Sequence, residues 1–256
     1  MKAEASRFID SDVFEGMVSF RSLINAIDTK ISDRKIIRVE YSRDRAKKIA
    51  NHLSYIKAMS YRHCFDLCEV DDSKISNVAI GTSHGGIITY CTSRTIPEIT
   101  DASLSENGFY VMLDGVEDPY NFGYALRSIY ASGADGVILP ERNWMSAAGV
   151  VCRASAGASE LMPLAMASPE ACIKVFKQNR YKIVCADIEK SVSVYDAELK
   201  KPLLLVVGGE KRGLSKVFTE NADVIVRLDY GREFGSALSA ASAASILAFE
   251  VLRNNR

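Results

Sequence analysis

Three polar residues between positions 121 and 210 have types and positions suited to chemistry on a hydroxyl or an anion. Asn121 follows an apolar run and a turn. At that place its side chain can cap a helix, because it can accept a hydrogen bond from an unpaired backbone N–H. Arg127 lies six residues later among apolar neighbours, and an arginine there needs a partner, either an internal carboxylate or an anionic ligand. Glu210 lies in a glycine-rich loop, where the backbone can approach a ligand closely and the carboxylate can accept from a hydroxyl or an amine. These three residues are our candidates for a catalytic site.

The loop around Glu210 differs from the loops that bind nucleotide phosphates. Residues 208–215 read Gly-Gly-Glu-Lys-Arg-Gly-Leu-Ser, which is neither G-x-G-x-x-G nor G-x-x-x-x-G-K-[ST]. A dinucleotide or ATP site is therefore not expected. A later loop, residues 229–235, precedes a run of Ser and Ala that permits either close helix packing or close approach of a ligand.

Short apolar runs alternate with helix-like stretches from Gly108 to the end of the chain. This alternation is typical of an α/β domain in which a parallel sheet carries helices on both faces. Ligands of such sheets bind at the carboxyl ends of the strands, and the loops that contain Asn121 and Glu210 lie there. The expected strands are Phe109–Leu113, Gly136–Leu139, Lys182–Ala186, Leu203–Val207 and Val224–Leu228, and the expected helices are Phe122–Ser132, Met145–Ala154, Pro169–Asn179 and Ser236–Arg253.

The first part of the chain, residues 13–94, is expected to form a separate small α/β domain. Strand-like runs occur at Ile36–Tyr41, Phe65–Val70 and Ile87–Cys91. The polar, aperiodic residues 95–107 are the expected linker to a second domain, residues 108–256.

Positive charge is concentrated in the first of these domains. Between Lys30 and Arg62 ten basic residues stand against three acidic ones, although the whole chain has a net charge of zero. A basic cluster is what binding to a phosphate backbone needs, while a solvated helix face gives the same pattern. We favour nucleic-acid binding, and the expected RNA-binding residues are Arg34, Lys35, Arg43, Arg45, Lys47 and Lys48.

The composition excludes several classes of protein. With 48% hydrophobic and 25% charged residues, the chain is neither disordered nor collagen-like. Six cysteines without a C-x-x-C pair, and an N-terminus without an apolar core, favour reduced thiols in the cytoplasm over export. No apolar run suits a membrane span, and His63, Cys64 and Cys68 lack the second ligand cluster of a zinc site. We therefore expect neither a membrane nor a metal as a partner.

Three segments resemble, in the same order along the chain, the three motifs of the SpoU/TrmH family of RNA ribose methyltransferases in the SPOUT superfamily. The first runs from Leu113-Asp114-Gly115-Val116 through Asn121-Phe122-Gly123 to Arg127. The second is Val207–Leu214, with its G-x-E-x-x-G-L core, and the third joins Leu228-Asp229-Tyr230 to Ala237–Ala241. Glu15-Gly16 and His84-Gly85-Gly86-Ile87 are similar to the ribosomal-protein-like RNA-binding domain that often precedes this catalytic domain.

The resemblance implies a SPOUT domain with a C-terminal trefoil knot that binds S-adenosylmethionine and forms a homodimer. It implies that Arg127 lies near the methyl group and the target ribose, and that Asn121 and Glu210 shape the pocket. The implied reaction moves a methyl group to a ribose 2′-hydroxyl of rRNA or tRNA, and it requires no metal because the cofactor carries the activated group. The implied cofactor-binding residues are Gly208, Gly209, Leu228, Leu238 and Ser239.

The third motif departs from the family pattern. Ser239 stands where the family has asparagine, and Ala241 stands where it has serine. This departure leaves two other hypotheses open. One is a relative of the same fold that binds RNA but has lost turnover, and the other is a methyltransferase that acts on a base or a protein.

Overall fold

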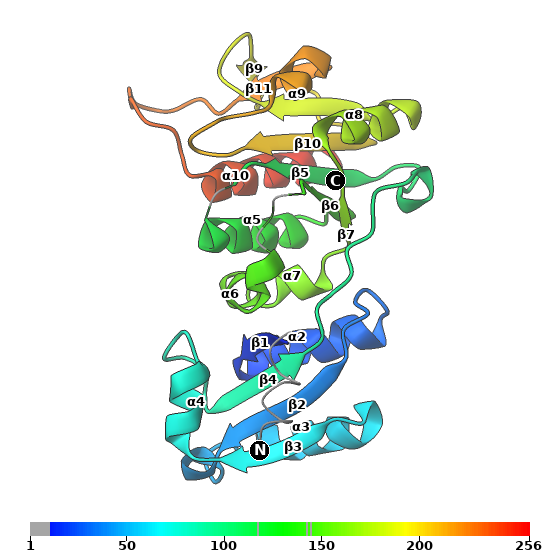
Figure 1. Cartoon of the computed structure of the whole chain (residues 1–256). Coiled ribbons are helices and arrows are strands. Elements are labelled where there is room, and N and C mark those ends of the chain that lie inside the picture. Colours follow the sequence, from blue (N-terminus) through cyan, green and yellow to red (C-terminus); the bar gives the residue numbers. More distant parts are fainter. Residues whose placement is uncertain (1–10, 117, 142, 144) are drawn as a thin grey trace. The chain divides into compact units, whose positions relative to one another are not determined.

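The computed structural model describes residues 11–116, 118–141, 143 and 145–256, and these form two compact units (Figure 1). The first unit contains the chain up to Thr95 together with Ala147–Leu161. The second contains Ile96–Ser146 and Met162–Arg256. The division expected from the sequence, 13–94 and 108–256, differs from these units in where it assigns residues 147–161. The chain therefore passes between the units three times, not once.

The first unit is built on a four-stranded mixed sheet in the order β1-β4-β2-β3. β2 and β3 are parallel, whereas β4 is antiparallel to both β1 and β2. Phe20, Leu23 and Ile24 recur at helical spacing, so one face of α2 joins the apolar core. The elements are β1 (Asp12–Glu15), α2 (Gly16–Asp28), β2 (Ile36–Ser42), α3 (Ala50–His63), β3 (Asp66–Val70), α4 (Asp72–Val78) and β4 (Ile87–Cys91).

Two short helices from the middle of the chain complete the first unit. α6 (Ala148–Ala154) contributes Ala148 and Cys152 to the core. α7 (Ala158–Leu161) carries Glu160, which is buried and accepts a 2.8 Å hydrogen bond from Nε of Arg34, 126 positions away in the sequence. Gly149 permits the close packing of α6, because a Cβ there would lie 2.0 Å from the carbonyl oxygen of Val13. Residues 11–95 thus share their core and a buried ion pair with residues 147–161.

Arg34 is buried, and this corrects its prediction as an RNA-binding residue. Only 1% of its side chain is exposed, and its guanidinium forms ion pairs with Glu160 and with Asp12. A buried guanidinium needs such partners because the desolvation of an unpaired charge is costly. Arg34 therefore stabilises the fold and is not accessible to a phosphate.

The second unit contains a seven-stranded parallel sheet in the order β7-β6-β5-β10-β8-β11-β9. Its central strands are apolar on both faces, as a sheet covered on both sides requires. The expected α/β fold with a parallel sheet is confirmed. The strands are β5 (Phe109–Asp114), β6 (Gly136–Leu139), β7 (Leu164–Met166), β8 (Lys182–Ala186), β9 (Val192–Ser193), β10 (Leu203–Gly208) and β11 (Val224–Arg227).

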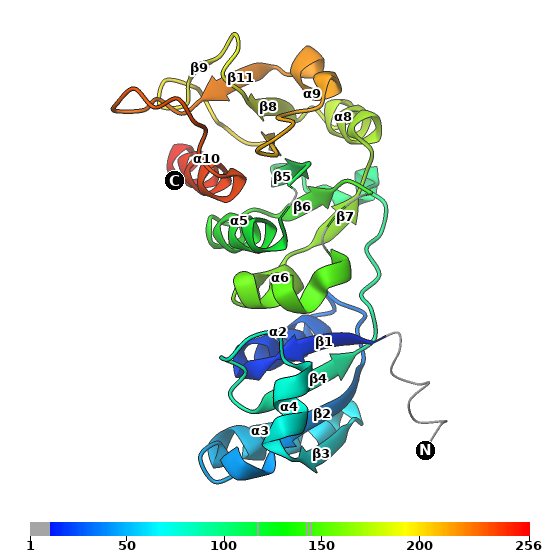
Figure 2. The ribbon, with the colours of Figure 1, turned by 60° about the vertical axis from the view of Figure 1, so that its left-hand side comes forward.

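The helices of the second unit cover both faces of this sheet. α5 (Pro119–Ala131) and α10 (Ala240–Asn254) pack side by side on one face, and α8 (Pro169–Gln178) and α9 (Lys216–Asn221) pack together on the other (Figure 2). Met112, Phe176 and Val206 are fully buried between strands and helices. Among the described residues, no helix is long and apolar enough to cross a bilayer.

We predict that the buried ion pair between Arg34 and Glu160 holds the first unit together. Arg34→Ala leaves Glu160 buried without its partner, so the free energy of unfolding should fall by about 3–5 kcal/mol. Urea denaturation followed by circular dichroism measures this change. Lys35→Ala, at the exposed neighbouring position, is the matched control and should change stability by less than about 0.5 kcal/mol. Equal effects of the two substitutions would contradict the assignment.

Candidate active site

The carboxyl ends of β5, β10, β8 and β11 lie at one edge of the second sheet, and the loops that follow three of them line a cavity of about 480 Å³. The volume lies within the range of pockets that enclose small molecules. The lining is formed mainly by the segments 186–188, 207–214 and 226–238 and by the first turns of α10. The cavity thus lies at the strand ends, where the parallel sheet predicts a ligand.

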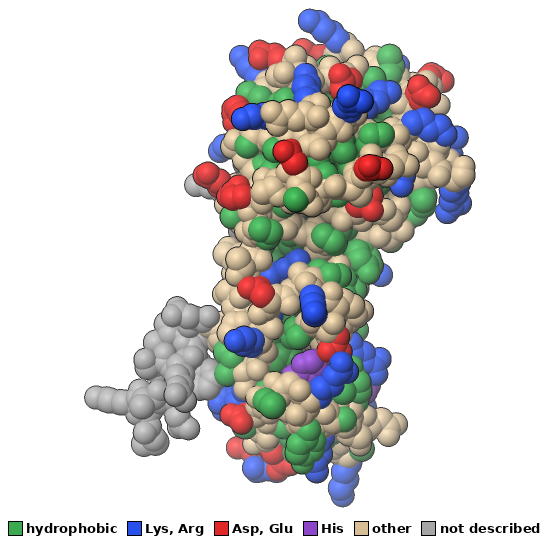
Figure 3. Space-filling view, turned by 90° about the vertical axis from the view of Figure 1, so that its right-hand side faces the viewer, with side chains coloured by type: hydrophobic (Ala, Val, Ile, Leu, Met, Phe, Trp, Pro, Cys, Tyr) green, Lys and Arg blue, Asp and Glu red, His purple; other side chains and the backbone are tan. Residues whose placement is uncertain are grey.

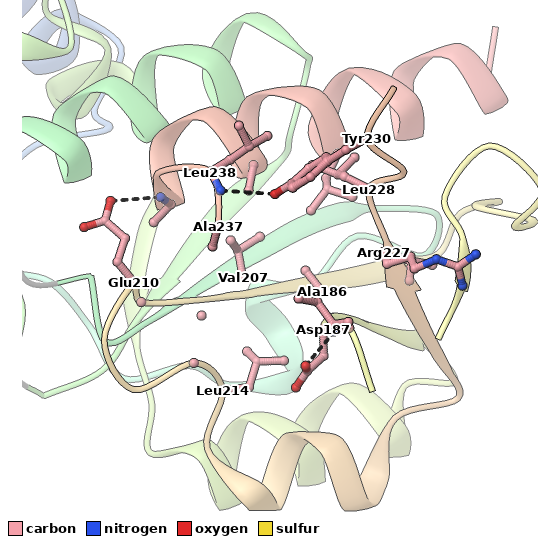
Figure 4. A pocket seen from close by; sticks show the side chains of 18 of the residues that line it. Ala186, Asp187, Val207, Glu210, Leu214, Arg227, Leu228, Tyr230, Ala237 and Leu238 are labelled. Atoms are coloured by element: carbon pink, nitrogen blue, oxygen red, sulfur yellow. Dashed lines mark hydrogen bonds between the residues drawn. The ribbon is translucent and has the colours of Figure 1, made fainter. Parts of the chain in front are cut away.

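Glu210 connects the first helix of the site to the last. Its Oε1 accepts a 2.8 Å hydrogen bond from Nδ2 of Asn121, which lies in the first turn of α5. The same oxygen accepts a 3.0 Å hydrogen bond from the backbone N–H of Ala240, the first residue of α10 (Figure 4). That N–H has no partner within its helix, and a carboxylate also interacts favourably with the positive end of the helix dipole. One side chain thus holds the starts of two helices beside the cavity.

A second carboxylate joins the loops that follow β5 and β10. Oδ2 of Asp114 accepts hydrogen bonds from the backbone N–H and the hydroxyl of Ser215, at 2.8 and 2.7 Å. The backbone N–H of Gly209 donates to the carbonyl oxygen of Asp114 at 2.8 Å. A Cβ at Gly209 would lie 2.0 Å from the carbonyl oxygen of Gly115, so only glycine allows this approach of the two loops.

The loop that follows β11 closes the other side of the cavity. The backbone N–H of Leu238 donates to the hydroxyl of Tyr230 at 3.2 Å (Figure 4). The rings of Tyr230 and Phe234 lie 6.1 Å apart. Asp229 accepts a 2.9 Å hydrogen bond from Nε of Arg227. A hydrogen bond from Ser193 and the charge of Arg227 hold the pKa of Asp229 below its usual range. This loop is therefore held by contacts within the described chain.

The structure places most of the predicted cofactor-binding residues around the cavity. Gly208, Gly209, Leu228 and Leu238 line it, together with Glu210. Ser239 is not among the lining residues. Its side chain accepts a 3.2 Å hydrogen bond from the backbone N–H of Ser242 and so caps α10. The part that each residue plays in binding stays a prediction.

Arg127 lies on the exposed side of α5 and does not line the cavity. No hydrogen bond or ion pair joins it to the residues that the structure describes. The internal carboxylate that the sequence left open as its partner is therefore absent from the described part of the chain. An anionic ligand is the remaining interpretation.

Comparison with known proteins identifies the family. Residues 108–249 match the model of the SpoU rRNA methylase family. A TrmH family tRNA/rRNA methyltransferase of Staphylococcus saprophyticus is 36% identical over 191 residues, which cover 72% of this chain and 76% of that protein. The chain belongs to the SpoU rRNA methylase family.

Other relatives of this SpoU family member agree with that assignment. A 23S rRNA (guanosine-2′-O-)-methyltransferase of Shewanella oneidensis is 31% identical, with 70% of this chain and 74% of that protein covered. The solved structure of an AdoMet-bound rRNA methyltransferase from Sinorhizobium meliloti superposes with a TM-score of 0.77 at 24% identity, covering 99% of this chain and 90% of that chain. The structural likeness extends over both units.

Asp187 and Ile188 line the cavity of this SpoU family member, and the sequence analysis did not select them. They directly follow the apolar run Lys182–Ala186, which is the strand β8. The rule that ligands bind at the carboxyl ends of parallel strands would have found them. The motif comparison did not, because no motif residue lies in this loop.

The predicted RNA-binding residues of the first unit fall into two groups. Lys35, Lys47 and Lys48 are exposed. Arg43 forms 2.9 Å ion pairs with Glu69 and Asp71, and Arg45 forms one with Asp72. These acidic residues lie beyond the basic segment in the sequence, so the segment's surplus of charge is partly neutralised in the fold. On the face shown in Figure 3, Lys and Arg side chains are interspersed with Asp and Glu side chains.

We predict that Asn121 and Glu210 act as a pair. Asn121→Ala and Glu210→Ala should each lower the free energy of unfolding, and the double variant should lose less than the sum, with a coupling of about 0.5 kcal/mol or more. Glu210→Gln keeps an oxygen that can accept from both donors and should stay closer to the natural protein than Glu210→Ala does. Urea denaturation of the four variants measures the coupling. Strictly additive losses would show that the hydrogen bond does not contribute.

Proposed function

We propose that this chain is an S-adenosylmethionine-dependent methyltransferase that methylates a ribose 2′-hydroxyl in structured RNA, either rRNA or tRNA. The observation that carries the proposal is the cavity at the strand ends, where Glu210 links Asn121 to the start of α10. Two of the loops that line it contain the second and third segments that resemble the family motifs, and the first segment contains Asn121, which donates a hydrogen bond to Glu210. The relatives named above as rRNA and tRNA methyltransferases support the same substrate class.

The residues around the cavity fit S-adenosylmethionine. Apolar side chains such as Leu214, Leu228 and Leu238 offer a surface to a flat purine, and the glycines expose backbone groups. The carboxylate of Glu210 adds negative charge, which suits a sulfonium cation. Gly208, Gly209, Leu228 and Leu238 would hold the cofactor, and Ser239 would act through the first turn of α10. When bound, the cofactor supplies a methyl group already activated by its positive sulfur.

The chain's own residues must then align the target hydroxyl and assist its deprotonation. Arginine is effectively always protonated, so Arg127 is not a general base. We assign Arg127 to holding the target phosphate and stabilising the developing alkoxide, with the proton lost to phosphate or water. Asn121 and Glu210 position the start of α5, on which Arg127 lies. In this mechanism the charge of Arg127 stabilises the reacting groups, whereas Asn121 positions the helix that carries Arg127.

The first unit is proposed to bind the folded RNA through shape and phosphate contacts. Its exposed lysines Lys35, Lys47 and Lys48 support this role, and Arg43 and Arg45 join them if phosphate competes with their acidic partners. Phosphate contacts of this kind release counterions, so RNA affinity should decrease as salt increases.

The assembly and location of the protein follow as further parts of the proposal. A homodimer through the second unit is supported by apolar side chains that α5 and α10 expose, namely Tyr120, Tyr124, Ile246 and Phe249. The packing of α10 beside α5, after the chain has passed through β11, supports the trefoil knot that the family resemblance implies. All six cysteines are free, which supports the cytoplasm.

A second candidate function is a relative that binds RNA but has lost turnover. The observation that favours it is Ser239, which replaces the family asparagine and uses its side chain to cap α10. Ala241 is buried and carries no polar group. The two candidates differ in whether a methyl group is transferred.

We predict that the protein transfers a labelled methyl group from S-adenosylmethionine to unmodified total RNA. Nuclease digestion and mass spectrometry should identify the product as a 2′-O-methyl nucleoside. Label in a base would contradict the ribose assignment while keeping the cofactor. Cofactor binding without any label, on RNA from cells that lack the protein, would favour the relative without turnover.

We predict that Arg127→Ala reduces methyl transfer by a factor of about 100 or more, since removal of one transition-state contact commonly costs that much. Its affinity for S-adenosylmethionine should stay within about twofold, because Arg127 does not line the cavity. Single-turnover transfer and calorimetric titration measure the two quantities. Lys174→Ala, at an exposed position of α8 on the other face of the sheet, is the control. Equal loss of transfer and of cofactor affinity in Arg127→Ala would contradict the assigned role.

A further inference from the structure

Asp187 is a carboxylate in the cavity to which neither the motifs nor the proposed mechanism gives a task. It follows the last residue of β8 and is partly exposed among the lining residues (Figure 4). Its Oδ1 accepts a 2.6 Å hydrogen bond from the backbone N–H of Ile188 and a longer one, 3.5 Å, from that of Glu189. These contacts hold the carboxyl group in one orientation. Within the described part of the chain, its Oδ2 has no hydrogen-bond partner.

The other carboxylates of the cavity are engaged differently. Asp229 binds Arg227 and Ser193. Glu210 binds Asn121 and the start of α10, on the side of the cavity where the proposed reaction takes place. Asp187 is therefore a preoriented acceptor that is separate from the reacting groups.

The sheet order shows how far Asp187 lies from the proposed reacting groups. β10 separates β8 from β5, with Val207 paired to Ala186 on one side and to Leu113 on the other. Adjacent strands are about 4.8 Å apart, so the end of β8 lies about 10 Å from the end of β5, after which the loop leads to Asn121. If the reacting methyl group is at the α5 side, one of the two long arms on the sulfur of S-adenosylmethionine extends to β8, either the nucleoside or the amino-acid arm.

We propose that Asp187 accepts hydrogen bonds from the 2′- and 3′-hydroxyls of the cofactor's ribose. An ionised carboxylate only accepts, and the ribose diol is the group of the nucleoside that offers two adjacent O–H donors. Adenine offers a single amino group. In another α/β fold an acidic residue that follows a strand binds a nucleotide ribose in the same way, which shows that the chemistry suits the position. Asp187 is thus a specificity-determining residue for the nucleoside half of the cofactor.

Calorimetric titration of two ligands tests this proposal. S-Adenosylmethionine and 5′-methylthioadenosine share the ribose diol, but the second lacks the amino-acid arm and the sulfonium charge. Asp187→Asn keeps an oxygen for the N–H groups of Ile188 and Glu189, so the turn is preserved. The variant should bind both ligands about tenfold or more weakly, as expected for the loss of hydrogen bonds to a charged acceptor. Glu189→Gln, an exposed neighbour that does not line the cavity, should bind both within about twofold.

A third ligand identifies the contacted group. The 2′-deoxy form of 5′-methylthioadenosine should bind the natural protein more weakly than the parent compound, and Asp187→Asn should discriminate much less between the two. Weaker binding of S-adenosylmethionine alone would overturn the proposal in favour of a contact with the charged amino-acid arm. Unchanged affinities for both ligands would show that Asp187 does not contact the cofactor.

The inference rests on the proposed cofactor site. One measurement distinguishes an error in the site from an error in the role of Asp187. Hydrogen exchange of the natural protein with and without S-adenosylmethionine should show protection of residues 207–214 and 226–240. Protection elsewhere, or nowhere, would refute the site itself. Protection in these segments together with a neutral Asp187→Asn would refute only the role of Asp187.

Discussion

The site depends on one carboxylate oxygen that serves two helices. Oε1 of Glu210 accepts from the side chain of Asn121 and from the backbone N–H of Ala240, so the starts of α5 and α10 are held next to the loop that follows β10. Without that acceptor, the amide and the helix N–H would both need water as a partner. The cavity is lined by three loops and by α10, and the contacts of Glu210 hold its own loop and the start of α10 beside α5.

The first unit also depends on a contact between residues that lie far apart in the sequence. Glu160 lies in a segment between two strands of the second sheet, and it neutralises Arg34 in the core of the first unit. The chain therefore crosses between the units three times, and residues 147–161 of the connection between β6 and β7 belong to the first unit. The proposed RNA-binding unit takes two of its core residues, Ala148 and Cys152, from the catalytic half of the chain. It is therefore not a domain formed by the N-terminal residues alone.

The sequence predicted those features that depend on local pattern. The continuous apolar runs identified β5, β6, β8, β10 and β11 almost to the residue, because strands buried on both faces carry little polar sequence. β7 and β9 were missed, since two or three residues give no readable period. The last helix begins at Ala240 and not at Ser236, because Ser239 caps it and the Tyr230–Leu238 contact holds the preceding loop. The burial of Arg34 was not predictable, because its partner lies 126 positions away.

A crystal structure of the natural protein grown with S-adenosylmethionine tests the central claim most directly. We expect the cofactor in the cavity lined by the loops after β8, β10 and β11, with the two hydrogen bonds of Glu210 retained. A cofactor bound at any other place, or a cofactor in the cavity whose binding breaks the contacts of Glu210 with Asn121 and Ala240, would contradict the account.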